Sequence, residues 1–173
     1  ACVVIVVLAI GILLICFQNK QEEEEYAKRR TELIEAYQKG TGDERLTAAL
    51  SLSFGSSYEV LKAEYTDNEA TVVLHAVEES TDEVAIRDYA RDTVTLMSWV
   101  FGIPDVDKLS VTFRHTFLDT GGNEIQADAF IIGISRENTT DINYENFLDM
   151  VWNDPSRLTD RADGYLITPA LRE

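Results

Sequence analysis

The first seventeen residues of the chain, Ala1 to Phe17, contain no charged side chain. As a helix they would extend roughly 25 Å at about 1.5 Å per residue. That length is near the lower limit for crossing a hydrocarbon core about 30 Å thick. The residues from Lys20 onward are polar and rich in charge. The sequence therefore predicts one transmembrane helix followed by one polar domain.

The apolar run is better read as a retained anchor than as a removable signal. A secretory signal has a shorter apolar region, of about 7–15 residues, and a small-residue cleavage site. Cys16 follows apolar residues, as in a lipidation signal, but Ile15 stands where a small residue is usual. We therefore expect an intact membrane helix, with a lipoprotein lipidated at Cys16 as the alternative.

The flank after this helix bears on its orientation. Lys20 and the bases at 28–30 favour the cytoplasmic side by the positive-inside rule. The acidic block 22–25 and the overall acidity suit the opposite side, because a cytoplasmic leaflet is itself negative. We expect a single-pass protein of the cell membrane with an extracytoplasmic domain.

The charge balance limits the partners of the polar domain. The formal net charge is −16, from 31 acidic and 15 basic residues. Such a surface repels nucleic-acid phosphates and favours a basic protein surface. The only cysteines, Cys2 and Cys16, lie in the apolar run. The polar domain therefore contains no disulfide, zinc-finger spacing or thiol nucleophile.

Residues 20–40 are expected to continue the first helix as a juxtamembrane stalk. Ion pairs Glu24–Lys28 and Glu25–Arg29 have the favourable i,i+4 order. An apolar stripe recurs at helical spacing and ends before Gly40, a good residue to follow a helix. The spacing predicts a buried face but leaves open whether it packs on the chain's own domain or on a neighbouring subunit. The stripe consists of Tyr26, Leu33, Ile34 and Tyr37.

The long helix expected over Ser80–Phe101 is the clearest element of the remaining domain, 41–173. Ser80 and Glu83 have capping-box spacing. Gly102 and Pro104 follow, as after a helix C-terminus. Five side chains spaced by four, three, four and three residues share one face. They are Ile86, Ala90, Thr93, Met97 and Val100.

Around this helix the sequence alternates as strands do. Hairpins are expected over 58–65 with 70–77, and over 109–117 with 124–135, joined by polar turns. Residues 50–54 are assigned to a strand, although 43–54 also fits a helix, and a short helix is expected over 144–152. Because no repeated βαβ unit is visible, we expect a two-layer α+β domain. It would be an antiparallel sheet of about four or five strands with the long helix across one face.

No pattern in the chain identifies a reaction. His115 occupies the apolar register of its strand, and His75 belongs to no ligand-spaced motif. There is no nucleophile elbow, phosphate loop or dinucleotide fingerprint. We therefore predict no catalytic, cofactor-binding or metal-binding residues, no cofactor and no enzyme activity.

The layout resembles that of small single-span accessory subunits of bacterial membrane assemblies, such as respiratory or secretion complexes. This resemblance implies a non-enzymatic stabilising subunit that contacts larger integral membrane subunits and the lipid bilayer through residues 1–39. The alternative is a membrane-tethered module for a small ligand or a cationic partner. Trp99 is either a partner anchor or covered by a loop, and the tail strand extends either its own sheet or a partner's. The predicted partner-contact residues are Tyr26, Leu33, Tyr37, Trp99, Tyr165 and Ile167.

Overall fold

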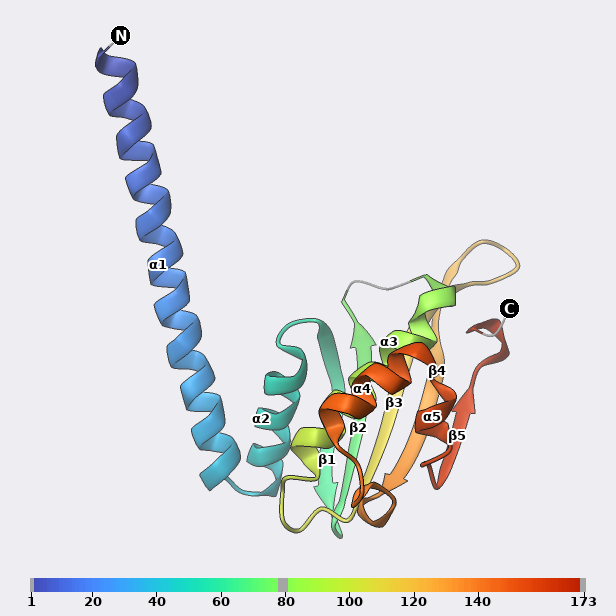
Figure 1. Cartoon of the computed structure of the whole chain (residues 1–173). Helices are drawn as coiled ribbons and strands as arrows, with labels where there is room; N and C mark the ends of the chain where they lie inside the picture. Colours follow the sequence, from blue (N-terminus) through green and yellow to red (C-terminus); the bar gives the residue numbers. More distant parts are fainter. Residues whose placement is uncertain (1, 78–80, 172–173) are drawn as a thin grey trace.

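The computed structural model describes the backbone of residues 2–77 and 81–171, and the side chains of these residues except 2–19, 82, 83 and 170. Figure 1 shows one long helix standing away from an α+β domain, in which helices cover one face of a five-stranded sheet. In chain order the elements are α1 (Cys2–Lys39), α2 (Gly42–Phe54), β1 (Tyr58–Thr66), β2 (Glu69–Ala76), α3 (Asp82–Val100), β3 (Lys108–Leu118), β4 (Glu124–Ser135), a 3-10 turn (Arg136–Thr139), α4 (Tyr144–Asn153), α5 (Ser156–Thr159), β5 (Gly164–Ile167) and a last 3-10 turn (Pro169–Leu171).

The predicted transmembrane helix over residues 1–19 is not supported. Among the residues whose side chains are described, no helix is long and apolar enough to cross a membrane. α1 runs on from the seventeen-residue apolar segment into residues 20–39, of which eleven are charged. Charged side chains resist burial in hydrocarbon, so this part of α1 cannot lengthen the apolar run. The finding contradicts the predicted single-pass membrane localisation; the side chains of 1–19, Cys16 included, lie outside the described residues.

The sheet is mixed, and the prediction of an antiparallel sheet is wrong. Its strand order is β1-β2-β3-β4-β5, with β2 and β3 parallel and the other neighbours antiparallel. The reason is the path of α3, which returns the chain to the end of the sheet where β2 begins. The N–H of Asp107 there donates to the carbonyl of Asn68, 2.8 Å away. β3 must then run in the same direction as β2, because parallel neighbours require such a crossover.

The predicted apolar face of α3 is confirmed. Ala90, Thr93, Met97 and Val100 are each 0% exposed, and Ile86 is half-buried against the same core. The facing strands β2 and β3 alternate buried and half-buried residues along most of their length. Buried side chains thus recur with the 3.6-residue period of a helix on α3 and at every second residue on β2 and β3, and the two sets pack together in one core layer.

The ends of α3 differ slightly from the prediction. The helix begins at Asp82 with Thr81 as N-cap, and the predicted capping pair Ser80 and Glu83 lies outside the described side chains. At the other end, the Arg136 guanidinium donates three hydrogen bonds of 2.6–2.7 Å to backbone carbonyls of the α3–β3 loop. This arginine fastens the crossover loop to the end of β4.

Both predicted hairpins form. Between β1 and β2, Asp67 and Asn68 have φ values of 52° and 64°. Two successive positive φ values are the signature of a tight type I′ hairpin turn, in which Asn and Asp are tolerated. Between β3 and β4, the Asp119 carboxylate accepts hydrogen bonds from the N–H groups of Gly121 and Asn123, at 2.7 and 2.8 Å. Local turn chemistry therefore accounts for both reversals.

The strand assigned to residues 50–54 is wrong, because this segment is the second half of α2. Ala48, Ala49 and Leu50 are all buried, and three consecutive buried residues fit a helix rather than an alternating strand. The helix start is stabilised where the Thr41 N–H donates to the Glu44 carboxylate at 2.7 Å. That contact lowers the pKa of Glu44.

The C-terminal elements complete the sheet. The predicted helix from residue 144 is confirmed as α4, and its N-cap Asn143 accepts a hydrogen bond from the N–H of Asn146 at 3.1 Å. β5 then adds antiparallel to β4, with Ile167 opposite Phe130. The tail therefore extends the chain's own sheet.

α1 is fastened to the domain near its C-terminal end. The Tyr37 hydroxyl donates to the carbonyl oxygen of Trp99 at 2.6 Å, and the two rings meet edge to face with centroids 5.2 Å apart. Burial raises the pKa of Tyr37, partly offset by the positive charges of Arg45 and Arg136, so the hydroxyl remains a donor. Tyr37 and Trp99, here called the α1 clamp, hold the base of α1 against the end of α3.

The α1 clamp predicts a specific intolerance at Gly102. A Cβ at this position would meet the Tyr37 hydroxyl. We expect Gly102→Ala to lower the free energy of unfolding by about 1–3 kcal/mol, a typical cost of overpacking. The cost should be smaller in a Tyr37→Phe background, because phenylalanine lacks the hydroxyl that is struck. Urea unfolding of the four proteins of this double-mutant cycle measures the coupling.

Gly164→Ala is the matched control, because a Cβ there would meet no atom within 4 Å. Its effect should stay within about 0.5 kcal/mol. An equal cost of Gly102→Ala in both backgrounds would show that the Tyr37 hydroxyl does not limit this position.

Candidate functional site

A recess of about 480 Å³ lies between α1 and the C-terminal end of α2, and we call it the α1–α2 cleft. It opens where α1 begins to leave the domain. Both helices contribute apolar and polar side chains, so the recess can bind a ligand of mixed character. The lining residues are Tyr26, Arg29, Arg30 and Leu33 from α1 and Ser51, Leu52, Ser53, Phe54, Gly55 and Ser56 from α2 and its exit.

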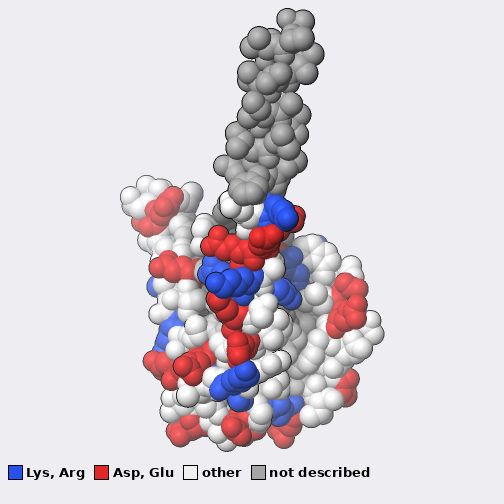
Figure 2. All heavy atoms as spheres, turned by 90° about the vertical axis from the view of Figure 1, so that its left-hand side faces the viewer, with Lys and Arg blue, Asp and Glu red and all other residues white. Residues whose placement is uncertain are grey.

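The α1 wall of the cleft is one face of the helix. Residues 26, 29, 30 and 33 follow the i, i+3, i+4, i+7 spacing that aligns side chains on a helix. Tyr26 is 66% exposed, whereas Leu33 is half-buried beside α2. Figure 2 shows this part of α1 crossing the molecule with acidic and basic side chains gathered in separate groups. Along this wall the side chains thus change from an exposed aromatic ring, through two guanidinium groups, to a half-buried leucine.

The opposite wall is fixed by the way α2 ends. Gly55 has φ of 58°, a conformation that favours glycine, and its N–H donates to the carbonyl of Ser51 at 3.0 Å. The Phe54 ring packs edge-on against Tyr58 with centroids 4.9 Å apart. The last carbonyls of a helix carry partial negative charge. The α2 wall therefore combines an ordered aromatic with the negative end of a helix dipole.

The positive charges of the cleft have no partner in the described part of the chain. Neither Arg29 nor Arg30 forms an ion pair or hydrogen bond there, and the predicted pair Glu25–Arg29 is not formed. Lys28 pairs with Glu32 at 3.9 Å instead of with Glu24, contrary to the prediction. Two guanidinium groups are thus available to an incoming negative group.

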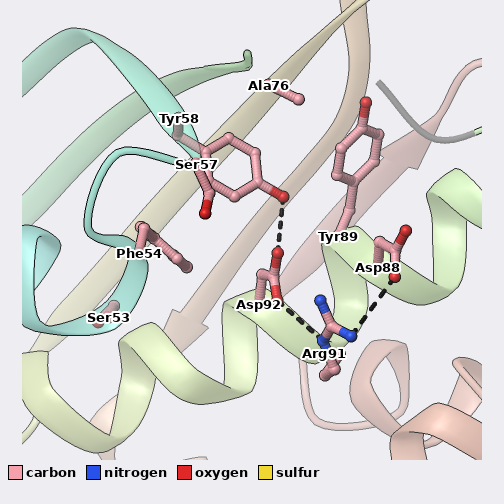
Figure 3. Close-up of a pocket in the computed structure, with 9 residues that line it drawn as sticks. All are labelled: Ser53, Phe54, Ser57, Tyr58, Ala76, Asp88, Tyr89, Arg91 and Asp92. Atoms are coloured by element: carbon pink, nitrogen blue, oxygen red, sulfur yellow. Dashed lines mark hydrogen bonds and ion pairs between the residues drawn. The ribbon is translucent and has the colours of Figure 1, made fainter. Parts of the chain in front are cut away.

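A second recess, of about 250 Å³, lies between α3 and the start of β1, and we call it the α3 pocket (Figure 3). The Tyr58 hydroxyl points at Asp92 and donates to its Oδ2 at 2.7 Å. The Arg91 guanidinium lies between two carboxylates, donating to Asp92 Oδ1 at 3.0 Å and lying 3.6 Å from Asp88 Oδ1. These four side chains form one connected polar cluster.

The electrostatics of the α3 pocket hold Tyr58 and Arg91 each in one protonation state. Burial, followed by the negative charge of Asp92, raises the pKa of Tyr58 well above its ordinary value. Burial opposes the charge of Arg91, but the Asp92 hydrogen bond and the charges of Asp92 and Asp88 together raise its pKa. Tyr58 therefore remains a donor and Arg91 a cation throughout the physiological range.

The two histidines lie on opposite faces of the sheet. His115 is 2% exposed in the core, and its Nδ1 lies 2.7 Å from the Tyr89 hydroxyl. His75 pairs in register with Arg114, the neighbour of His115, and so faces away from the core. Its Nε2 lies 3.0 Å from the Gln126 side-chain nitrogen. The fold therefore does not bring the two imidazoles together into a common site.

The predicted partner-contact residues fall into three places. Tyr26 and Leu33 line the α1–α2 cleft. Tyr37 and Trp99 contact each other as the α1 clamp, and so pack within the chain. Tyr165 and Ile167 lie on β5, where Tyr165 is 52% exposed and Ile167 packs against the core.

Sequence reasoning missed the other side chains of the cleft, among them Arg29, Arg30, Leu52 and Phe54. Arg29 and Arg30 lie three and four residues after Tyr26, so the helical spacing that selected Tyr26 and Leu33 also carried the signal for them. Leu52 and Phe54 had no such signal, because their segment was assigned to a strand.

Comparisons of the chain with protein-family models, with curated proteins and with solved structures found no match.

The α3 pocket leads to a prediction about stability at high pH. Replacing Tyr58 by phenylalanine removes the hydrogen bond to Asp92 and should cost about 1–2 kcal/mol at neutral pH. Tyrosine in the unfolded chain ionises near pH 10. Because the raised pKa keeps Tyr58 protonated in the folded state, the folded protein then binds more protons, and its stability falls as the pH rises above about 10. Tyr58→Phe should show a shallower fall, measured by urea unfolding at a series of pH values.

Tyr165→Phe is the control, because Tyr165 is 52% exposed on the edge strand. It should leave both the neutral-pH stability and its alkaline slope close to wild type. Identical alkaline slopes for wild type and Tyr58→Phe would contradict the assigned role of the Tyr58 hydroxyl.

Proposed function

We propose that this chain is a non-enzymatic, protein-binding subunit of a larger assembly. In this proposal the α1–α2 cleft holds a helical segment of another chain. The observation that carries it is the lining of the cleft, in which Tyr26 and Leu33 flank two guanidinium groups that have no partner in the described part of the chain. A segment that offers both apolar and carboxylate side chains would satisfy all four positions.

The position of α1 supports this role. α1 is fastened to the domain at its base by the α1 clamp and extends away from the domain beyond the cleft. Most of its side chains between residues 20 and 39 are exposed. An exposed helix with a defined base is suited to binding a partner helix, because little ordering cost is added when the complex forms.

The acidic surface outside the cleft supports a second contact of the same kind. The net charge of −16 favours a basic protein surface as a further partner. Such charge complementarity would mainly accelerate association and set orientation, while the cleft would supply the specific contacts.

A second candidate function is the binding of a small polar ligand in the α3 pocket. The observation that favours it is that two carboxylate residues, Asp88 and Asp92, line one recess together with Ser53 and Ser57. A ligand with several hydrogen-bond donors would match this lining. The two candidates separate experimentally, because ligand binding would respond to changes at Tyr58 and not to changes at Leu33.

The leading proposal is tested with the full chain isolated from its own cells. Wild type should migrate at a native mass well above 19.5 kDa, in fixed stoichiometry with a companion that is either another protein or a second copy of this chain. Leu33→Glu replaces the apolar end of the cleft with a carboxylate at i+3 and i+4 from Arg30 and Arg29. It should remove that companion, because the apolar contact is lost and the two guanidinium groups then have a partner within the chain. Light scattering with mass spectrometry of the peak measures the outcome.

Thr31→Glu is the matched control, since it changes the charge by the same amount on an exposed part of α1. It should retain the companion, and circular dichroism should show both variants folded. A wild-type chain without any companion, or a complex that survives Leu33→Glu, would overturn the proposal.

A further inference from the structure

On the face of α1 that carries Tyr26, the charges on one side of Tyr26 are opposite in sign to those on the other side. Toward the N-terminus it presents Glu22 and Glu23, and toward the C-terminus it presents Arg29 and Arg30. At about 100° per residue, all four lie within about 60° of Tyr26 around the helix axis. Rotating this face by half a turn about Tyr26 places each acid over a base. The face is therefore complementary in charge to a second copy of itself in the antiparallel direction.

Among the residues whose side chains the structure describes, none forms an ion pair with any of these four charges. In the described residues, the ion pairs along α1 are Lys20–Glu24, Lys28–Glu32 and Glu35–Lys39. Glu24, Lys28 and Glu35 point to the side of α1 opposite Tyr26 by the same helical geometry. The far side of the helix thus neutralises itself, whereas the Tyr26 face keeps two like-charged blocks.

Such blocks are unfavourable in a lone helix. Glu22 and Glu23 repel each other, as do Arg29 and Arg30, through the ordinary Coulomb repulsion between like charges. An antiparallel contact would replace both repulsions with attraction. A parallel contact would place acid on acid and base on base, so the pattern selects the antiparallel direction.

We propose that the α1–α2 cleft is occupied by α1 of a second copy of this chain, crossing antiparallel about a two-fold axis at Tyr26. Glu22 and Glu23 of one copy then face Arg30 and Arg29 of the other, and the two Tyr26 rings meet at the axis. This inference rests on the proposed function and names the partner of its cleft. The interface is isologous, since each surface supplies both halves of the charge pattern.

The cleft lining fits this occupant. Arg29 and Arg30 form part of its wall, so the acidic turn of the second copy would enter at its mouth.

The placement of the domains fits as well. Each copy carries a net charge of −16, which opposes close approach of two domains. The domain follows α1 at Gly40, about 20 Å along the helix from Tyr26. An antiparallel crossing therefore places the two acidic domains on opposite sides of the axis, whereas a parallel one would set them side by side.

The test is a charge-reversal series on the purified full chain, measured by sedimentation velocity at low and high salt. Wild type should be a dimer that weakens as the salt concentration rises. Glu22→Lys with Glu23→Lys, or Arg29→Glu with Arg30→Glu, should each raise the dissociation constant about tenfold or more, because four attractions become repulsions. A one-to-one mixture of the two double variants should recover the dimer, and so should the chain that carries all four changes.

Two control variants change the charge equally on the opposite side of α1. They are Glu24→Lys with Glu35→Lys, and Lys28→Glu with Lys39→Glu. Both should dimerise nearly as well as wild type, losing only exposed pairs within the helix.

Cysteine cross-linking determines the direction of the contact in a chain from which Cys2 and Cys16 have been removed. A mixture of Glu22→Cys and Arg30→Cys proteins should link to each other, and neither should link efficiently to itself. Self-linking of Glu22→Cys would indicate a parallel contact and overturn the proposal.

The remaining outcomes separate this inference from the proposed function. A wild-type monomer at low salt, or a mixture that does not recover the dimer, would overturn the second copy as occupant. If Leu33→Glu still removes a different companion protein, the protein-binding function stands with another partner. If the Leu33→Glu chain keeps every companion that the wild type has, a second copy included, both proposals fail.

Discussion

The crossover through α3 is the constraint on which the other elements of this structure depend. Because β2 and β3 are parallel neighbours, the chain must return across the sheet between them, and α3 provides that return. α2 and α4 both pack against α3, and the α1 clamp is made on its last turn at Trp99. Arg136 then secures the loop by which α3 reaches β3.

The candidate site depends indirectly on this arrangement, because α3 carries the residue to which α1 is fastened. The α1 clamp sets where α1 leaves the domain, and Gly55 ends α2 opposite the exposed turns of α1. The cleft therefore has one wall formed by the end of α2, which is held in the domain, and one wall formed by α1, which extends away from the domain. The cleft carries two guanidinium groups although the chain as a whole is strongly acidic. The local positive charge, rather than the net charge of −16, therefore determines which groups can bind there.

Local signals accounted for much of the fold. The face of α3, both hairpins and the N-cap at Asn143 were predictable, because each depends on residues close together in the chain. α2 was misassigned in part since Leu46 to Phe54 alternates in the sequence while its burial comes from packing on α3. Of the cleft, Tyr26 and Leu33 were predicted, but Phe54 depended on knowing that α2 is a helix.

The sequence alone determined the periodic faces, the turns, the charge pattern around Tyr26 and the absence of cysteine beyond residue 16. These are properties of short segments, decided by sterics, side-chain spacing and composition. Tertiary structure alone decided that β2 and β3 run parallel, that Tyr37 and Trp99 pack on each other and that α1 faces the end of α2. Each of these pairings joins residues distant in the chain, and the choice among them depends on how the whole core packs.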